Sequence, residues 1–311
     1  MHIFLFKCII LTGFLFLFCF GVIMPQYLYG FDAALLDKTK RAGELEGPKI
    51  ILSGNSNLIF GIDSARIEEM VGMPVVNLGM HAGLGNAFLD NIAPYFVKEG
   101  DIVIYCHTEY ADDDRILNEQ LAWITLEDHF SLWRFLRPKD IPGMVKAYPT
   151  YLKDCIDLWL AGKGNQKTGE AYTREYFNIY GDNVFPRKEQ QMQFTEGQIN
   201  VPAINDTCID RMNAIEKKIR KKGGTMLVAA YPVVVCKFTP PEEEYSAFWE
   251  RLDAKLDCEI ISDISDYRYD EKYFFDSAYH LNDAGVKLRT EQLIRDIINW
   301  KANQGKGGGR K

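Results

Sequence analysis

The stretch KIILSGNS (residues 49–56) joins a short apolar run to a small polar turn. A run rich in Ile and Leu is typical of a strand buried on both faces of a parallel sheet. Gly54 allows the chain to turn sharply, so we expect Ser56 to project at the carboxyl end of this strand. In open α/β sheets that edge carries ligands and reactive groups. An ordinary polar turn and a phosphate-binding loop of the flavodoxin type are the competing interpretations of this loop.

The rest of the chain alternates between similar apolar runs and amphipathic stretches. The further predicted strands are 74–78, 101–107, 225–231 and 258–262, and the predicted helices are 63–71, 84–98, 203–222, 242–256 and 283–300. This alternation predicts an α/β fold in three layers, α/β/α, with a five-stranded parallel sheet and right-handed crossovers. The predicted domain covers residues 49–303, and 304–311 are expected to form a disordered tail.

Residues 111–200 interrupt this alternation. The insertion is rich in aromatic residues, among them Trp123, Trp133 and Trp159, and it is broken by several Pro and Gly residues. We expect a mostly helical subdomain over the carboxyl ends of the strands. Its aromatic side chains could stack on sugars, but an insertion of this size needs a core of its own, and packing is the favoured interpretation.

The N-terminus predicts a membrane anchor. From residue 3 to residue 24 the sole charge is Lys7, and a helix of that length spans roughly 33 Å. A cleaved signal peptide is the alternative, but the apolar run is long for one and no small-x-small cleavage site follows it. We therefore assign residues 1–25 to a transmembrane helix and 26–48 to a polar linker. The flanking charges do not decide the orientation.

Composition excludes several classes of function. Lys and Arg total 36 against 43 Asp and Glu, a net charge of -7, and no basic stripe of the kind that tracks nucleic-acid phosphates is present. The seven cysteines show no C-x-x-C spacing, so neither a zinc ribbon nor a dense disulfide framework is expected. We expect no cofactor, no metal and no nucleic-acid partner.

A serine nucleophile needs a base, and the chain has five histidines. His280 follows the fifth predicted strand and precedes the last helix, whose expected N-cap is Asn282. Its loop should leave the same edge of the sheet as the loop that holds Ser56. Asp276, four residues earlier, could orient the imidazole or simply cap a turn. Serine after the first strand with Asp and His before the last helix is a rarer combination than either part.

With this combination the chain resembles the SGNH (GDSL-like) hydrolase family, in particular its membrane-anchored envelope branch, which includes the lipoteichoic-acid D-alanylation protein and alginate O-acetylation proteins. The family's Gly-Asp-Ser block stands here as Gly54-Asn55-Ser56, and its second block as Asn77-Leu78-Gly79. The resemblance implies a flavodoxin-like strand order of 2-1-3-4-5. It also implies catalytic residues Ser56, His280 and Asp276, with an oxyanion hole built from Ser56, Gly79 and Asn55.

Two blocks depart from the family pattern. Asp276 precedes His280 by four residues rather than three, which leaves its role open. The third block, Gly-x-Asn-Asp, is absent, and Cys106-His107-Thr108-Glu109 stands there instead. An ionised Glu109 cannot donate to an oxyanion, so we assign Glu109 and His107 to substrate binding. A metal cluster with Asp112, Asp113 and Asp114 is disfavoured because contiguous residues alternate faces.

The resemblance implies a single-pass membrane protein whose catalytic domain is extracytoplasmic. It would act as a serine esterase or acyltransferase on O-acyl groups of an envelope or exported polysaccharide, with a membrane-bound O-acyltransferase as a possible partner. A catalytically silent SGNH-like scaffold that binds glycan or such a partner is the second hypothesis, which the missing third block favours. A phosphate- or nucleotide-binding flavodoxin-like domain is the third.

Overall fold

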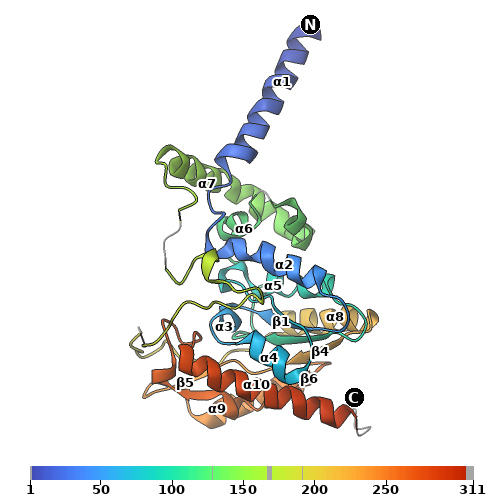
Figure 1. Cartoon of the computed structure of the whole chain (residues 1–311), viewed down its shortest axis with the longest axis vertical. Coiled ribbons are helices and arrows are strands. Elements are labelled where there is room, and N and C mark those ends of the chain that lie inside the picture. The colour runs from blue at the N-terminus through green and yellow to red at the C-terminus, as the bar shows by residue number, and fades with distance from the viewer. Residues whose placement is uncertain (1, 128, 167–169, 191, 306–311) are drawn as a thin grey trace.

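A computed structural model of the 311-residue chain describes residues 2–127, 129–166, 170–190 and 192–305. Figure 1 shows a long N-terminal helix, α1 (His2–Phe18), that projects from a folded body. The last helix, α10 (Asp283–Gln304), ends where the predicted tail 304–311 begins. Residues 306–311 of that tail lie outside the described residues.

Five parallel strands form the central sheet. They are β1 (Ile50–Gly54), β2 (Val75–Asn77), β3 (Ile102–Cys106), β4 (Thr225–Val228) and β6 (Glu259–Ile260). Their order is β2-β1-β3-β4-β6, and every neighbouring pair is parallel. Because β6 is the fifth strand that the sequence predicts, the predicted sheet and its order are confirmed. The loops that follow these strands therefore leave from one edge.

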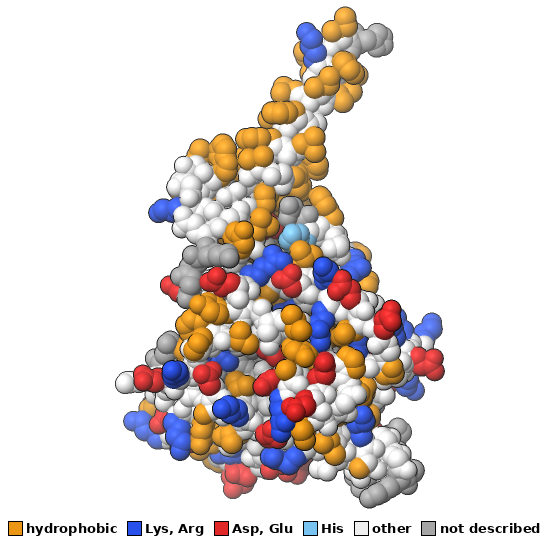
Figure 2. Space-filling model, in the orientation of Figure 1, with side chains coloured by type: hydrophobic (Ala, Val, Ile, Leu, Met, Phe, Trp, Pro, Cys, Tyr) orange, Lys and Arg blue, Asp and Glu red, His pale blue; other side chains and the backbone are white. Residues whose placement is uncertain are grey.

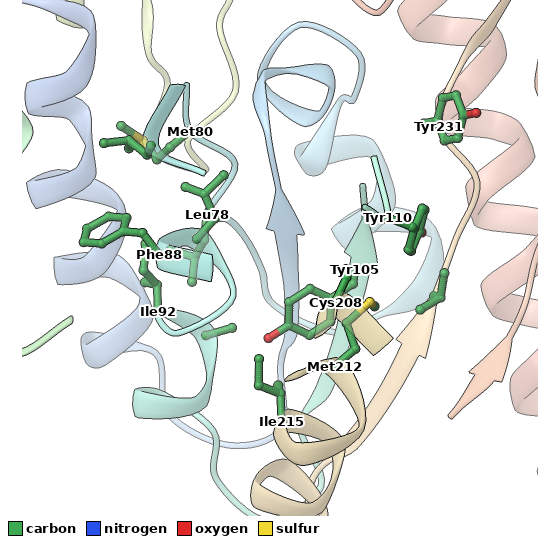
Figure 3. Packing of buried hydrophobic residues seen from close by; sticks show 14 of the residues in the cluster. Leu78, Met80, Phe88, Ile92, Tyr105, Tyr110, Cys208, Met212, Ile215 and Tyr231 are labelled. Atoms are coloured by element: carbon green, nitrogen blue, oxygen red, sulfur yellow. The ribbon is translucent and has the colours of Figure 1, made fainter. Parts of the chain in front are cut away.

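Helices cover both faces of the sheet. Alternate residues of β3 separate the two cores: Val103 and Tyr105 pack with α2 (Ala34–Glu44), α5 (Asn86–Leu89) and α8 (Asp206–Lys221), as Figure 3 shows for Tyr105. Ile102 and Ile104 pack on the other face against α4 (Ser64–Val71) and α10. This period-two alternation on a strand buried on both faces produces the three layers.

Three elements differ from the sequence-based expectation. Residues 26–48 are not merely a linker, because α2 lies there and Lys38 is buried against the sheet. The helix predicted at 84–98 is replaced by the short α5 and a 3-10 turn, since Pro94 cannot donate within a continuous helix. A second small sheet, β5 (Val233–Val235) with β7 (Arg268–Asp270), was not predicted, and α9 (Glu242–Asp253) follows its first strand.

The insertion has two unlike halves. Its first half contains α6 (Glu119–Leu126) and α7 (Ile141–Leu160), which pack on each other and lie between α1 and the sheet in Figure 1. Its second half is largely irregular but reaches the carboxyl ends of the strands. There Tyr180 O accepts from Asn77 N at the end of β2, and Asn183 N donates to Ile59 O beyond β1. The expected helical cap is thus helical near α1 and irregular at the sheet edge.

The N-terminal helix is long and apolar enough to cross a membrane. The candidate span is Ile3–Ile23, 21 residues with a mean hydropathy of 2.5, and its side chains are largely exposed, whereas Ile23 at its end is buried. Figure 2 shows hydrophobic side chains along its length. Immediately after the span, Met24 is fully buried against Tyr151, whose hydroxyl donates to Met24 O.

All seven cysteines carry free thiols.

Candidate active site

The loop after β1 presents Ser56 at the start of the short helix α3 (Ser56–Ile59). A Cβ at Gly54 would lie 2.4 Å from Cys106 O on the neighbouring strand, so this turn requires glycine. Asn55 is the N-cap of α3, and its side chain accepts from Asn57 N. The nucleophile candidate therefore sits on a constrained turn at the carboxyl edge of the sheet, as predicted from the residue pattern.

A buried arginine on α10 hydrogen-bonds to this turn. Arg289 on α10 is fully buried, and it donates to Asn57 O at 2.6 Å and to Asn57 Oδ1 at 2.7 Å. Asn57 Nδ2 in turn donates to Asn55 Oδ1 and to Cys106 O. The side chains of Arg289, Asn57 and Asn55 are thus joined in one hydrogen-bond network, which holds the backbone that carries Ser56 in a fixed position.

His280 meets Ser56 from the loop before α10. His280 Nε2 lies 2.8 Å from Ser56 Oγ, and His280 Nδ1 lies 2.7 Å from Asp276 Oδ1. A turn positions the histidine, because Ser277 Oγ accepts from His280 N, and Asn282 caps α10 as expected. With Nδ1–H donating to the carboxylate, Nε2 is free to accept the Ser56 proton. The four-residue spacing thus brings Asp276 to the imidazole after all.

Tyr172, from the irregular half of the insertion, completes the hydrogen-bond chain. Its hydroxyl donates to Asp276 Oδ2 at 2.6 Å and lies 3.2 Å from His280 Nδ1. Burial alone would raise the pKa of Asp276, but the hydrogen bonds from His280 and Tyr172 outweigh this and hold the pKa below its ordinary value. Burial and the bond to Asp276 raise the pKa of Tyr172, so the phenol stays protonated and donates. Asp276 is consequently a carboxylate at neutral pH.

Aromatic rings line the histidine. The Phe60 ring centroid lies 4.5 Å from that of His280, and Phe31 stacks on Phe60 at 5.8 Å. The Arg187 guanidinium lies over the Phe60 ring, 5.3 Å from its centroid. Rings on this side keep water from His280 and restrict its rotation, which preserves the contact with Ser56.

The predicted oxyanion hole is only partly available. Gly79 N donates to Asn77 Oδ1 at 2.9 Å, and Gly79 O accepts from the buried Lys38 Nζ at 2.6 Å. Asn55 uses one amide proton on Thr108 Oγ1 at 2.7 Å. Among the described residues, the donors left beside the serine are Ser56 N, the second amide proton of Asn55 and the Thr108 hydroxyl. Gly79 therefore offers no free N–H. Its lack of a side chain lets the backbone pass close to Asn55 O, because a Cβ at this position would lie 2.9 Å from that oxygen.

The assignment of His107 to substrate binding is wrong. His107 is fully buried, and its Nε2 lies 2.7 Å from Asp90 Oδ1 in the interior. Arg211 donates to the other oxygen of Asp90 at 2.9 Å. His107 continues the alternation of β3 on the same side as Tyr105, and this period-two pattern could have placed it in the core.

Glu109, the other predicted substrate-binding residue, is exposed. Burial, followed by the charge of Glu109, raises the pKa of Tyr279, which puts this carboxylate near the residue that precedes His280. Asp112 and Asp114 are engaged elsewhere, by Arg211 and Arg137 respectively. The acidic run therefore serves the packing of the insertion and does not gather around Ser56.

Sequence reasoning missed two residues at this edge. Tyr172 lies in an insertion with no periodic pattern, and no local signal identifies it. His81, in the loop after β2, lies near His280, since partial burial and the charge of His280 both lower the pKa of His81. A histidine two residues beyond Gly79 in the second loop was a signal that the sequence contained.

No protein-family model matches this chain, and a search of curated proteins finds none similar to it in sequence. Inference about its function therefore depends on the geometry of the site.

Proposed function

We propose that this chain is a membrane-anchored, SGNH-like serine esterase or acyltransferase that acts on O-acyl groups of an envelope or exported polysaccharide. The observation that carries the proposal is the continuous hydrogen-bond chain Ser56–His280–Asp276, with 2.8 Å and 2.7 Å between its members. Nucleophile, base and orienting acid within hydrogen-bond reach are the signature of covalent acyl transfer.

The mechanism follows from the protonation states. His280 Nε2 removes the Ser56 proton while Ser56 Oγ attacks the ester carbonyl, and Asp276 stabilises the imidazolium that forms. Ser56 N, with Asn55 and Thr108 beside it, would stabilise the tetrahedral oxyanion. The imidazolium then protonates the leaving alcohol. Water or a sugar hydroxyl, deprotonated by His280, next takes the acyl group from Ser56.

The apolar span Ile3–Ile23 supports attachment to a membrane, and the resemblance to the envelope branch supports an extracytoplasmic placement of the domain. A membrane-bound O-acyltransferase that supplies the acyl group would be a fitting partner for such a protein.

Acyl release by the purified full-length protein tests the proposal. Acetate liberated from an O-acetylated polysaccharide, and turnover of a small aryl acetate, are measured for wild type, Ser56→Ala and the matched control Ser53→Ala. Ser53 lies on β1 and faces the buried core rather than His280. We expect turnover by wild type and by Ser53→Ala and none by Ser56→Ala. Equal rates for all three variants would contradict the esterase proposal.

A catalytically silent scaffold is the second candidate, and one observation favours it. Because Gly79 N is used by Asn77, one of the oxyanion donors of the family is missing, which costs an esterase about 10²- to 10³-fold in rate. A scaffold would bind acylated glycan equally well with Ser56→Ala and would turn over no ester in either form.

A further inference from the structure

The length of α1 fixes how deeply its base must sit in a bilayer. The span Ile3–Ile23 has 21 residues and consists of α1 and the π-helical turn Cys19–Ile23 that follows it, which together extend at most roughly 31 Å at 1.5 Å per residue. The hydrocarbon core of a bilayer is about 30 Å thick. Almost no helix is left over, so the last turns of the span, including Phe18 and Phe20, must lie inside the membrane boundary.

Those last turns touch the insertion. The Phe18 ring meets Trp159 near the end of α7 edge-on, with 5.9 Å between centroids, and Phe20 stacks on Phe130 at 6.1 Å. Trp159 is 41% exposed and Phe130 is 63% exposed. Since Phe18 and Phe20 lie within the membrane boundary, the partners beside them reach the same depth.

Helix α7 is more apolar than its place in the protein requires. Met144, Tyr151 and Cys155 form the buried stripe that packs on the protein core. An adjacent apolar stripe carries Ile141, Val145, Leu152, Ile156 and Trp159, which recur at helical spacings of three, four and seven residues. Leu152 and Ile156 are half-buried against the protein core, whereas Ile141, Val145 and Trp159 are exposed. Val145 is 65% exposed and Leu160, at the helix end, is 71% exposed. The opposite face carries Lys146, Thr150, Lys153 and Asp157, all exposed.

We propose that α7 is an interfacial helix whose second apolar stripe is covered by the lipid of the bilayer that α1 crosses. Figure 1 shows α7 running across the base of α1, and Figure 2 shows hydrophobic side chains continuing from α1 onto the adjoining helices. An amphipathic helix in this position buries its apolar face at the boundary of headgroups and acyl chains, with Trp at headgroup level. Continuity with α1 favours lipid over a protein partner, because lipid necessarily surrounds the adjoining turns.

This contact would hold the catalytic edge at a set distance from the membrane. The insertion that supplies α7 also supplies Tyr172, which bonds to Asp276. A body held in the bilayer by α1 alone would move with every change in the tilt of that helix, whereas a second contact along α7 restricts this motion. The inference depends on α1 spanning a bilayer and does not depend on the chemistry of Ser56.

Lipid exposure of two faces of α7 tests the proposal. Val145→Cys on the apolar stripe and Thr150→Cys on the polar face are made in the full-length chain, in a background where the four cysteines that are not fully buried are replaced by alanine. Each is labelled with an environment-sensitive nitrobenzoxadiazole fluorophore and reconstituted in phosphatidylcholine nanodiscs. Leu160→Cys is a second probe of the apolar side, and circular dichroism selects the variants that keep the native fold.

We expect emission from positions 145 and 160 to shift to shorter wavelength and to be quenched by lipids that carry a spin label on the acyl chain. Emission from position 150 should match that of the dye in water and resist this quenching. Equal quenching on the two faces of α7, whether strong or absent, would overturn the proposal. A blue shift at 145 and 160 without quenching by lipid would also overturn it, because a protein would then cover the stripe.

Discussion

Two Asp–His pairs in this molecule have the same nitrogen-to-oxygen distance and different surroundings. His280 Nδ1 lies 2.7 Å from Asp276 at the edge of the sheet, and His107 Nε2 lies 2.7 Å from Asp90 in the interior. The first pair keeps side-chain exposures of 10% and 21%, whereas the second has none. The pair itself therefore does not define a reactive centre.

The neighbours of the two pairs account for the difference. His280 uses its second nitrogen on Ser56, at a loop that opens from the carboxyl ends of the strands. His107 lies beside Tyr105, with 5.7 Å between the ring centroids, and the second oxygen of Asp90 accepts from Arg211. Burial raises the pKa of Asp90, but His107 and Arg211 outweigh that and hold it below its ordinary value. The first pair hydrogen-bonds to a serine hydroxyl at the edge of the sheet, and the second balances charge in a core.

The largest expected effect follows from breaking the contact between Ser56 and His280. Ser56→Ala, His280→Ala and the double variant should each lose about 10⁴-fold or more in ester turnover, because residues that act as a unit are not additive. Rates of aryl acetate hydrolysis measure this. If the two residues acted independently, the loss of rate in the double variant relative to wild type would equal the product of the two single losses.

Asp276→Asn should have the next largest effect, a loss of about 10²- to 10⁴-fold in kcat, because the amide no longer fixes the donating tautomer of His280. Stability at pH 7 should change less than it does for a fully buried pair, since the side chains of His280 and Asp276 are 10% and 21% exposed. The depressed pKa of Asp276 contributes stability that is present above its unfolded value, near 4, and lost as the pH falls through the folded value. A thermal unfolding curve that collapses at pH 7 would contradict this assignment.

Asp90→Asn is the matched substitution in the second pair, and its effect should fall on stability. It removes a fully buried charge from His107 and Arg211, at a cost of about 3 kcal/mol or more. Denaturant unfolding measures the loss, and turnover per folded molecule should remain that of wild type. An unchanged free energy of unfolding together with a large drop in kcat would place this pair in the chemistry.

The smallest expected effect on stability is that of Asp32, a buried carboxyl whose pKa is not lowered by a neighbouring cation as that of Asp90 is. It is buried beside Phe31, its Oδ1 has no hydrogen-bond partner among the described residues, and burial raises its pKa to about 7. The folded protein binds this proton more tightly than the unfolded chain, so stability falls as the pH rises from about 4 to about 7. Asp32→Asn should stabilise the protein by about 1 to 3 kcal/mol at pH 8. Melting temperatures at pH 8 and pH 4.5 test this, and an equal change at both would refute it.

Much of the sheet edge was predictable from local patterns. Apolar runs located the five strands, and Ser56 was located just beyond the first of them, because parallel strands bring their following loops to one edge. His280 was located from its place between the fifth predicted strand and the last helix. The Asn282 cap fixed the start of α10. These predictions depend on periodicity and on short spacings, which the sequence shows directly.

What could not be predicted depends on contacts far apart in the sequence. The partner of Asp276 is Tyr172, more than a hundred residues away in an insertion without a pattern. The use of Gly79 N by Asn77 depends on how two turns pack, which no spacing reveals. Helix α2 was missed because its many charges resemble a linker, although Lys38 is buried and bonded to Gly79 O.

Covalent labelling of Ser56 tests the central claim most directly. The full-length protein is treated with a fluorophosphonate, and the modified peptide is identified by mass spectrometry for wild type, His280→Ala and Asp90→Asn. The account predicts an adduct on Ser56 in wild type and in folded Asp90→Asn, and a greatly slowed reaction in His280→Ala. The absence of an adduct on Ser56 in folded wild type, or an equal labelling rate in His280→Ala, would contradict it.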